Sequence, residues 1–312
     1  MKLKELMYEW LVGYAGERVK KRTYGRYENL MTLHILPDLG EMEVGDIKGR
    51  DIQTFLAKKR RCGNTKTGTQ LSASSTNLIL TVLHLAFAYG CDMELLEQNP
   101  CDRVHRIPPD KNEVEAFTRQ EQRCLEKTIA DSGDPRLIGV TLCLYSGLRL
   151  GELLGLEWQD VDLRRGVLQI NKTIYRAKDD AGVWSTFVDT PKTKASRREL
   201  PLPHFITNAL REAKTKAKSP YVVENKKGGQ MSVRSYQYLF SSLTKKAGVR
   251  PLNFHALRHT FATRALESGM DVKTLSDLLG HQSPTVTLTR YAHSMSDTKV
   301  RAMRKLPQIY RA

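Results

Sequence analysis

Apolar side chains at the start of the chain recur with the period of an α-helix. The positions i, i+3, i+4 and i+7 of this pattern are filled by Leu3, Leu6, Met7, Trp10, Leu11 and Tyr14. Such a stripe predicts an amphipathic helix that buries one face. The same spacing resumes at Tyr24 and is expected to end in "ILPDLG", because Pro37 and Gly40 both interrupt helices.

The next two patterns are also helical. The stretch "GRDIQTFLAKKR" predicts a short helix, and the segment Ser72 to Thr76 supplies caps for a longer one. The apolar face of this longer helix is expected to hold Leu78, Val82, Leu85, Ala86 and Tyr89. Residues 1–106 therefore predict a small, all-helical domain.

A polar segment that contains prolines separates this domain from the rest of the chain. Residues 107–117 have no apolar period, which is typical of an interdomain linker. Thr118 and Glu121 then form the signature of a capping box, which starts a new helix. The second domain is predicted to run from 118 to 312.

The second domain mixes helices with a few strands. A nearly continuous apolar helix is expected over residues 136–158, interrupted at Ser146 and Gly147. Alternation in "GVLQINKTIYR" predicts a strand, and "STFVDT" and "RELPL" predict two more that are joined by a turn. The buried face of the first strand is expected to hold Leu168, Ile170 and Ile174.

Helices are expected again near the end of this domain. Gly269 and Gly280 each follow a helical pattern, where a glycine commonly ends a helix, and Pro284 stands at a first helical position. The predicted fold class is therefore mainly α: a helical N-terminal domain, and a C-terminal mixed α/β domain of helices with a small antiparallel sheet.

The charge of the chain indicates a binding partner. The 312 residues include 50 Lys and Arg against 34 Asp and Glu, a formal net charge of +16. Such an excess attracts polyanions, and duplex DNA is the leading expected partner. Two basic runs in the N-terminal domain are candidates for phosphate contacts or, equally, for a solvated face: Lys20, Lys21 and Arg22, and Lys58, Lys59 and Arg60.

Cysteine usage and hydropathy indicate where the chain resides. The five cysteines are odd in number, scattered and free of any C-x-x-C pair, as in a reducing compartment. No stretch is apolar enough for a signal peptide or a membrane span, so no membrane partner is expected. These observations predict a soluble, cytoplasmic protein.

Four fragments carry candidate chemistry, and each is weak alone. They are "SGLRLGEL", "PKTKASRRELPL", "HALRH" and "LLGHQSPTVTLTRYAH". Arg149 and Glu152 at i, i+3 are usually a surface ion pair, and His255 with Arg258 is more often structural than functional. Tyr291 taken singly is typical of a half-buried core aromatic.

Together and in this order, the four fragments resemble the tyrosine recombinase family, also called phage-type integrases. The resemblance covers nearly the whole chain and is greatest to integrases of phages and integrative elements of Gram-positive bacteria. The family's arginine box, hairpin lysine, H-x-x-R box, G-H box and tyrosine fall here on Arg149 with Glu152, Lys192 or Lys194, His255 with Arg258, His281 and Tyr291. The N-terminal helices resemble the family's core-binding domain.

The resemblance implies DNA strand cleavage and rejoining with no metal, cofactor or ATP. Tyr291 would attack the phosphodiester and form a 3′-phosphotyrosyl intermediate, which needs a base or a cationic pocket because a phenol is a poor nucleophile at neutral pH. Arg149 and Arg258 would clamp the phosphate through paired guanidinium hydrogen bonds. His255 would be the acid/base group, and His281 would hydrogen-bond a non-bridging oxygen.

The remaining roles fall on "PKTKASRRELPL" and on one carboxylate. The first lysine of the pair matches the hairpin lysine of the family, so Lys192 is expected ahead of Lys194 as the acid that protonates the leaving 5′-oxygen. Lys194, Arg197 and Arg198 are expected to hold DNA phosphates. Glu152 would hold its Arg or His partners in place.

Assembly is also implied by the resemblance. Recombination through a Holliday junction would use a tetramer on two DNA sites, with a DNA-bending protein or an excisionase as accessory partners. The final residues are expected to form a tail helix that packs on a neighbouring protomer or folds back on its own domain. Many such integrases carry a further N-terminal arm-binding domain, so the chain is expected to be a simple recombinase or a shortened form.

Two other functions stay open at this point. A type IB topoisomerase shares the tyrosine chemistry but relaxes DNA without site specificity or synapsis. A non-catalytic DNA-binding regulator would need neither Tyr291 nor a hairpin lysine.

Overall fold

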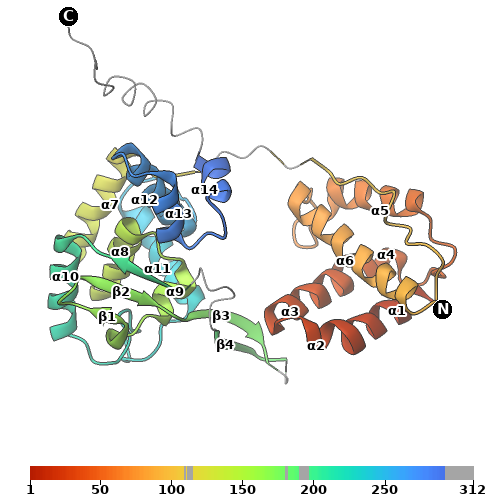
Figure 1. The fold of residues 1–312 in the computed structure, drawn as a ribbon, viewed down its shortest axis with the longest axis horizontal. Helices are drawn as coiled ribbons and strands as arrows, with labels where there is room; N and C mark the ends of the chain where they lie inside the picture. The colour runs from red at the N-terminus through yellow and green to blue at the C-terminus, as the bar shows by residue number, and fades with distance from the viewer. Residues whose placement is uncertain (109, 111–114, 180–181, 190–196, 292–312) are drawn as a thin grey trace, which may run out of the picture. The chain divides into compact units, whose positions relative to one another are not determined.

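The computed structural model of the chain describes residues 1–108, 110, 115–179, 182–189 and 197–291 (Figure 1). By internal contacts the chain divides into two units, with the change at Asn112 and Glu113, within the expected linker. The first unit also includes the short segment Ala177–Trp184. Lys192, Lys194 and the expected tail helix lie outside the described residues.

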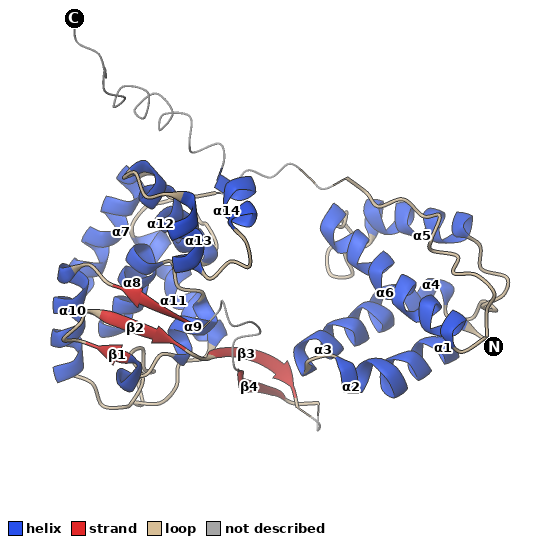
Figure 2. Cartoon of the chain, viewed as in Figure 1, coloured by secondary structure: helices blue, strands red, loops and turns tan. Residues whose placement is uncertain are grey.

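The N-terminal unit is helical, as the sequence predicts (Figure 2). Its elements are α1 (Leu3–Glu9), the π-helix η1 (Trp10–Ala15), α2 (Gly16–Arg18), α3 (Lys21–Leu30), the π-helix η2 (Met31–Ile35), α4 (Leu36–Leu39), α5 (Gly49–Cys62) and α6 (Ala73–Asp92). Leu3, Leu6, Met7, Trp10 and Leu11 are all buried in one core, which confirms the first apolar stripe. Its last member, Tyr14, is partly buried against the same core.

Two details of this unit differ from the sequence prediction. Pro37 does not end its helix: it lies in the first turn of α4, after the π-helical turn of η2, where a missing N–H is tolerated. On α6, Leu85 is 37% exposed, whereas Ile79, Leu83 and Phe87 are fully buried. This helix is enclosed over a wider arc than one stripe, so apolar spacing alone does not select its buried face.

The first helix of the C-terminal unit begins with a capping box. The Thr118 hydroxyl accepts a hydrogen bond from the Glu121 backbone N–H at 3.1 Å, and the Glu121 carboxylate accepts one from the Thr118 N–H at 2.7 Å. This confirms the predicted capping box. The helices that follow are α7 (Arg119–Ser132), η3 (Pro135–Leu137), α8 (Ile138–Ser146), α9 (Leu150–Gly155), η4 (Trp158–Asp160), α10 (His204–Thr215), α11 (Val233–Lys246), α12 (His255–Glu267), α13 (Val272–Leu279) and α14 (Pro284–Tyr291).

The strands form two small sheets. They are β1 (Val161–Asp162), β2 (Val167–Ile170), β3 (Thr173–Lys178), β4 (Trp184–Asp189) and β5 (Arg198–Pro201). The order is β1-β2-β5 in one sheet and β3-β4 in the other. The predicted long strand is therefore divided into β2 and β3, and the "RELPL" strand pairs with β2 rather than with β4. Leu168 of β2 lies opposite Leu200 of β5, and both are buried, which explains this choice of partner.

Glycine geometry shapes the helices that carry the candidate site. Gly147 has φ of 66°, a left-handed conformation that suits glycine, and it ends α8 before Arg149 begins the turn into α9. Gly280 has φ of 64° and ends α13 in the same way. α12, α13 and α14 share a small apolar cluster of their own. Within the described residues, no helix combines the length and apolarity needed to cross a bilayer.

Candidate active site

The two expected clamp arginines converge on the C-terminal end of α13. Arg149, at the start of α9, donates from Nη2 to the Gly280 carbonyl at 3.2 Å. Arg258, on α12, donates from Nη2 to the Leu279 carbonyl at 2.6 Å and from Nη1 to the Gly147 carbonyl at 2.8 Å. The structure thus brings together side chains that are more than 100 positions apart in the sequence.

Arg258 is an unusually enclosed cation. Its side chain is among the largest fully enclosed ones, and only 2% of the residue is exposed. Burial, followed by the positive charge of Arg149, lowers the pKa of Arg258 to about 9. The group therefore stays cationic at neutral pH. A buried charge that is fixed by two backbone carbonyls is already oriented before a phosphate arrives.

Glu152 holds two arginines rather than one. Its Oε1 accepts from Arg149 Nη1 at 2.8 Å, and its two oxygens accept from Arg198 Nη1 at 3.2 Å and Nη2 at 3.0 Å. Burial raises the pKa of this carboxyl, but the hydrogen bonds and charge of Arg198, with the charge of Arg149, outweigh it and hold the pKa at about 2. Glu152 is therefore an anion at any working pH.

The position of Arg198 does not fit the expectation that it holds a DNA phosphate. All three of its guanidinium nitrogens already donate to protein acceptors: Nε to the Leu278 carbonyl at 2.7 Å, and Nη1 and Nη2 to the Glu152 carboxylate. Arg197, which directly precedes β5, is exposed and remains compatible with a phosphate contact, while Arg198 faces the protein.

Three histidines lie near enough to the arginines for the charges to shift their pKa values. Desolvation and the charges of nearby arginines lower the pKa of His255 to about 4 and that of His281 to about 4. Desolvation, followed by His255 and the same cations, lowers the pKa of His259 to about 3. All three imidazoles are therefore neutral at pH 7, and a neutral imidazole keeps one ring nitrogen as a hydrogen-bond acceptor. His281 Nδ1 is 2.7 Å from the Thr287 hydroxyl, which orients its ring.

The expected nucleophile is buried in the described structure. Tyr291 ends α14 and is 2% exposed, packed in the cluster of α12, α13 and α14. Its hydroxyl lies 2.6 Å from His259 Nδ1. Burial raises the pKa of the phenol, against the opposing charges of Arg258 and Arg290. The nearest titratable neighbour of the phenol is therefore an imidazole, and the two side chains share one hydrogen bond.

His259 is a site residue that the sequence analysis missed. Its ring meets that of His255 edge-on, with centroids 4.6 Å apart. The available signal was the spacing: His255 and His259 stand at i and i+4, which places them on one face of α12 with Arg258 adjacent. Only the fold brings the ring to Tyr291, which is 32 positions away.

The expected basic runs of the N-terminal unit are partly engaged with carboxylates. Lys58 and Lys59 both pair with Asp38, and Arg60 pairs with Asp110 at 2.8 Å. The side chain of Lys58 is 62% exposed and that of Lys59 only 12%, so a phosphate contact fits Lys59 least. Lys20 and Arg22, at the start of α3, are exposed, and Lys21 is intermediate.

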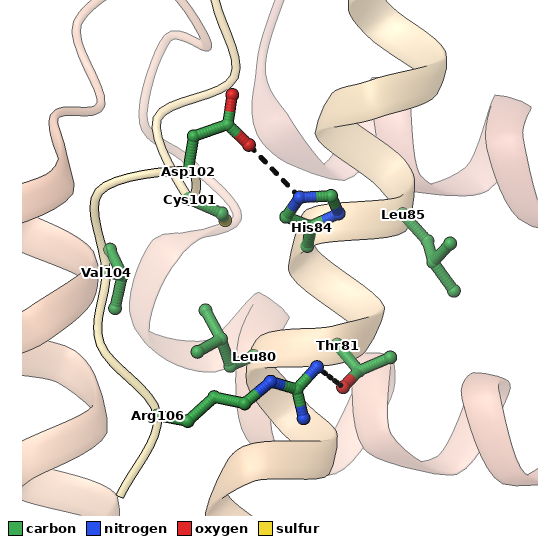
Figure 3. A pocket seen from close by; sticks show the side chains of 8 residues that line it. All are labelled: Leu80, Thr81, His84, Leu85, Cys101, Asp102, Val104 and Arg106. Carbon is green, nitrogen blue, oxygen red and sulfur yellow. Dashed lines mark hydrogen bonds and ion pairs between the residues drawn. The ribbon is translucent and has the colours of Figure 1, made fainter.

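A separate pocket lies in the N-terminal unit (Figure 3). It has a volume of about 290 Å³ and is lined by Leu80, Thr81, His84, Leu85, Cys101, Asp102, Val104 and Arg106. Its polar side chains pair with one another: His84 Nε2 lies 3.1 Å from Asp102 Oδ1, and Arg106 Nη2 donates to the Thr81 hydroxyl at 3.2 Å. The pocket contains none of the candidate catalytic residues.

Comparisons with known proteins agree with the geometry. Residues 110–297 match the Phage integrase family, and residues 2–60 match the N-terminal SAM-like domain of phage integrases. The chain is 29% identical over 335 residues to the tyrosine recombinase XerC-like protein of Caldanaerobacter subterraneus subsp. tengcongensis, with 99% of this chain and 83% of that protein covered.

Two further similarities point the same way. The chain is 26% identical over 294 residues to the ICEBs1 integrase of Bacillus subtilis, with 88% of this chain and 74% of that protein covered. It is also similar to the solved structure of the Tn1549 transposon integrase in complex with transposon right end DNA. That similarity has a TM-score of 0.81 at 25% identity and covers 98% of this chain and 99% of the other.

Proposed function

The chain belongs to the phage integrase family of tyrosine recombinases, and we propose that it cuts and rejoins DNA at specific sites through Tyr291. The observation that carries this proposal is the hydrogen bond of the Tyr291 hydroxyl to a neutral histidine, next to two arginines fixed on the end of α13. In this proposal Tyr291 is the nucleophile, His259 the proton acceptor, and Arg149 with Arg258 the phosphate clamp, and the hydrogen bonds among these groups support it.

In the proposed cleavage step, Arg149 and Arg258 donate hydrogen bonds to the non-bridging oxygens of the scissile phosphate. The charge on these oxygens increases as the phosphorus becomes pentavalent, and fixed guanidinium groups stabilise it without reorganising. His281 adds a further hydrogen bond to the same oxygens. Glu152 keeps Arg149 in place.

Proton transfer accompanies the exchange of bonds at phosphorus. The Tyr291 proton passes to His259, whose cationic form is favoured once the anionic phosphate is bound beside it, the bond between the Tyr291 oxygen and phosphorus forms, and the bond to the 5′-oxygen breaks. Lys192 protonates the departing 5′-oxygen, with Lys194 as the alternative, and His255 acts as acid/base toward the DNA. The product is a 3′-phosphotyrosyl bond. After strand exchange, a second 5′-hydroxyl attacks this phosphorus, which rejoins the DNA and releases Tyr291. Neither a metal ion nor ATP is needed, because arginines neutralise the charge and the phosphotyrosyl bond conserves the energy.

The proposed partners are double-stranded DNA and further copies of the chain. The similar Tn1549 integrase is bound to DNA in its solved structure, which supports the first. Two matching sites and a Holliday junction require four strand cleavages, which supports a tetramer. A DNA-bending protein or an excisionase would act on this assembly, and a cytoplasmic location is proposed with it.

The test compares the wild-type chain with Tyr291→Phe on nicked suicide substrates, in EDTA and without ATP. These substrates are cut from the DNA that flanks the gene. We expect a covalent protein–DNA adduct with the wild type and none with the Phe variant, which should still bind DNA. An adduct formed by the Phe variant would exclude Tyr291 as the nucleophile.

The same preparation separates the alternative functions. Relaxation of any supercoiled plasmid by the wild type, without pairing of two sites, would favour a type IB topoisomerase. Site-specific binding with no adduct on any flanking fragment would favour a regulator. Recombination only between two matching sites is the expected result.

A further inference from the structure

Three successive carbonyl groups at the end of α13 each accept a hydrogen bond from a different arginine. The Leu278 carbonyl accepts from Arg198, that of Leu279 from Arg258 and that of Gly280 from Arg149. The last carbonyls of a helix have no partner within the helix and carry its negative dipole end, so cations are favourable there. Two of these arginines form the proposed phosphate clamp, and the third, Arg198, is the one whose position does not fit the phosphate contact expected of it.

Arg198 is joined to the clamp a second time, through Glu152. One carboxylate, only 5% exposed, is shared by Arg198 and Arg149. Arg198 makes two hydrogen bonds to it, one to each oxygen, whereas the Arg149 guanidinium makes one. The paired geometry is the stronger of the two, so Arg198 takes up most of the negative charge of Glu152.

This sharing has a consequence for Arg149. A buried carboxylate that faced Arg149 alone would form a closed ion pair with it and would offset much of the charge that a phosphate needs. With Arg198 present, two positive charges meet one negative charge. The excess positive charge remains on the side of the more exposed Arg149, whose side chain is 36% exposed.

We propose that Arg198 is a positioning residue of the clamp: it occupies Glu152 so that Arg149 keeps its charge for the phosphate, and it fixes the end of α13 against β5. This inference rests on the proposed DNA cleavage. It also assigns to Arg198 a role other than the DNA contact that the sequence predicted. Arg198 acts through Glu152 and α13 and does not touch the DNA.

The test measures DNA affinity and single-turnover cleavage separately for Arg198→Met. The substrate is the flanking-DNA suicide duplex on which the wild type forms its adduct. We expect cleavage at saturating DNA to fall roughly ten- to a hundred-fold, as for other partners that orient a functional side chain. The salt dependence of binding should stay that of the wild type, because no phosphate contact is lost.

Two other arginines calibrate this result. Arg165→Met removes an exposed arginine that pairs with Glu199, the neighbour of Arg198 on β5, and should leave binding and cleavage unchanged. Arg197→Met should lower the salt slope of log K by about 0.9, the signature of one lost phosphate contact. If Arg198→Met behaved like Arg197→Met and cleaved at the wild-type rate once bound, the proposal would be overturned.

A double variant tests whether Arg198 acts through Glu152. Glu152→Gln removes the charge that Arg198 takes up, so Glu152→Gln with Arg198→Met should cleave no more slowly than Arg198→Met alone. Losses that multiply would show independent roles and contradict the proposal. If the Met variant does not fold, Arg198→Lys takes its place, because lysine keeps the charge but not the paired geometry: its cleavage at saturating DNA should be slower than that of the wild type, at wild-type affinity.

Failure of this inference and failure of the proposed function give different results. If the wild type forms no adduct on any flanking fragment, the proposed function fails. If the wild type forms the adduct and Arg198→Met does so at the same rate, only the role of Arg198 is wrong.

Discussion

The basic run of α5 in the N-terminal unit and the candidate-site arginines of the C-terminal unit hold their charges in opposite ways. In the N-terminal unit, the basic run of α5 pairs with the carboxylates of Asp38 and Asp110, and most of these side chains keep contact with solvent. In the C-terminal unit, Arg258 and Arg198 are 2% and 6% exposed and are bound to backbone carbonyls. The same residue types therefore sit in two different electrostatic settings.

This difference suggests that exposed cations serve DNA binding and buried arginines serve the cleavage reaction. Exposed ion pairs contribute little to stability and are screened by salt, so a phosphate can replace the carboxylate partner at small cost. Buried guanidinium groups on fixed carbonyls cannot exchange partners in this way, and their geometry is set before DNA binds. The first arrangement suits a grip on any duplex, and the second suits stabilisation of a transition state.

The largest effect is expected at the buried clamp. Arg258→Lys replaces a planar group that reaches both Gly147 and Leu279 with one ammonium that cannot satisfy both carbonyls in the same geometry. Cleavage should fall about a hundred- to a thousand-fold, with DNA affinity little changed. A buried carbonyl left without its partner should also destabilise the fold by about 1–3 kcal/mol.

Arg149→Lys is the matched control, because Arg149 is more exposed than Arg258. It should lose cleavage to a similar degree while its melting temperature stays near that of the wild type. If Arg258→Lys cleaved within tenfold of the wild-type rate, the buried guanidinium group would not be needed to stabilise the transition state.

A smaller effect is expected from pH, and it should come from the histidines of the C-terminal unit. The unfolded chain protonates histidine near the ordinary pKa of 6.5, whereas His255, His259 and His281 resist protonation down to about 3 or 4 in the folded state. The unfolded state thus binds more protons as pH falls below 6.5, and the free energy of unfolding should fall with it.

Thermal unfolding measured at pH 7 and pH 5 checks this sign. The window avoids the carboxyl of Glu152, whose pKa is about 2. The wild-type melting temperature should fall by a few degrees, and by less in His259→Asn, which lacks one of the three depressed groups. An equal fall in both proteins would contradict the depressed pKa of His259, because it would show that this residue does not take up a proton on unfolding.

The smallest effect is expected in the N-terminal unit. Lys58→Met should weaken DNA binding a few-fold and lower the salt slope of log K by about 0.9, with cleavage at saturation unchanged. Lys59→Met is its control, since the two lysines share Asp38 but only Lys58 is well exposed. The Lys59 variant should keep the wild-type slope. Equal slopes for all three proteins would show that this run is only a solvated face.

Much of the fold could be predicted from local pattern. The capping box at Thr118, the helix ends at Gly147 and Gly280, and the start of α14 at Pro284 were all predicted, because caps act over three or four residues. The predicted helix end at Pro37 was the exception: this proline lies in the first turn of α4, directly after the π-helix η2, where no backbone N–H is needed. The partner of β5 was not predictable, because strand pairing depends on which core faces meet.

The candidate site divides along the same line. By itself the sequence determined the set and order of the catalytic residue types, and hence the family, since these reside in short motifs. Only the tertiary structure decided that His259 meets Tyr291, and that Arg198 turns inward to Glu152 while Arg197 faces solvent. These contacts join residues 32 and 46 positions apart. Ion pairs and burial at such separations are fixed by how helices and strands pack, which no local spacing encodes.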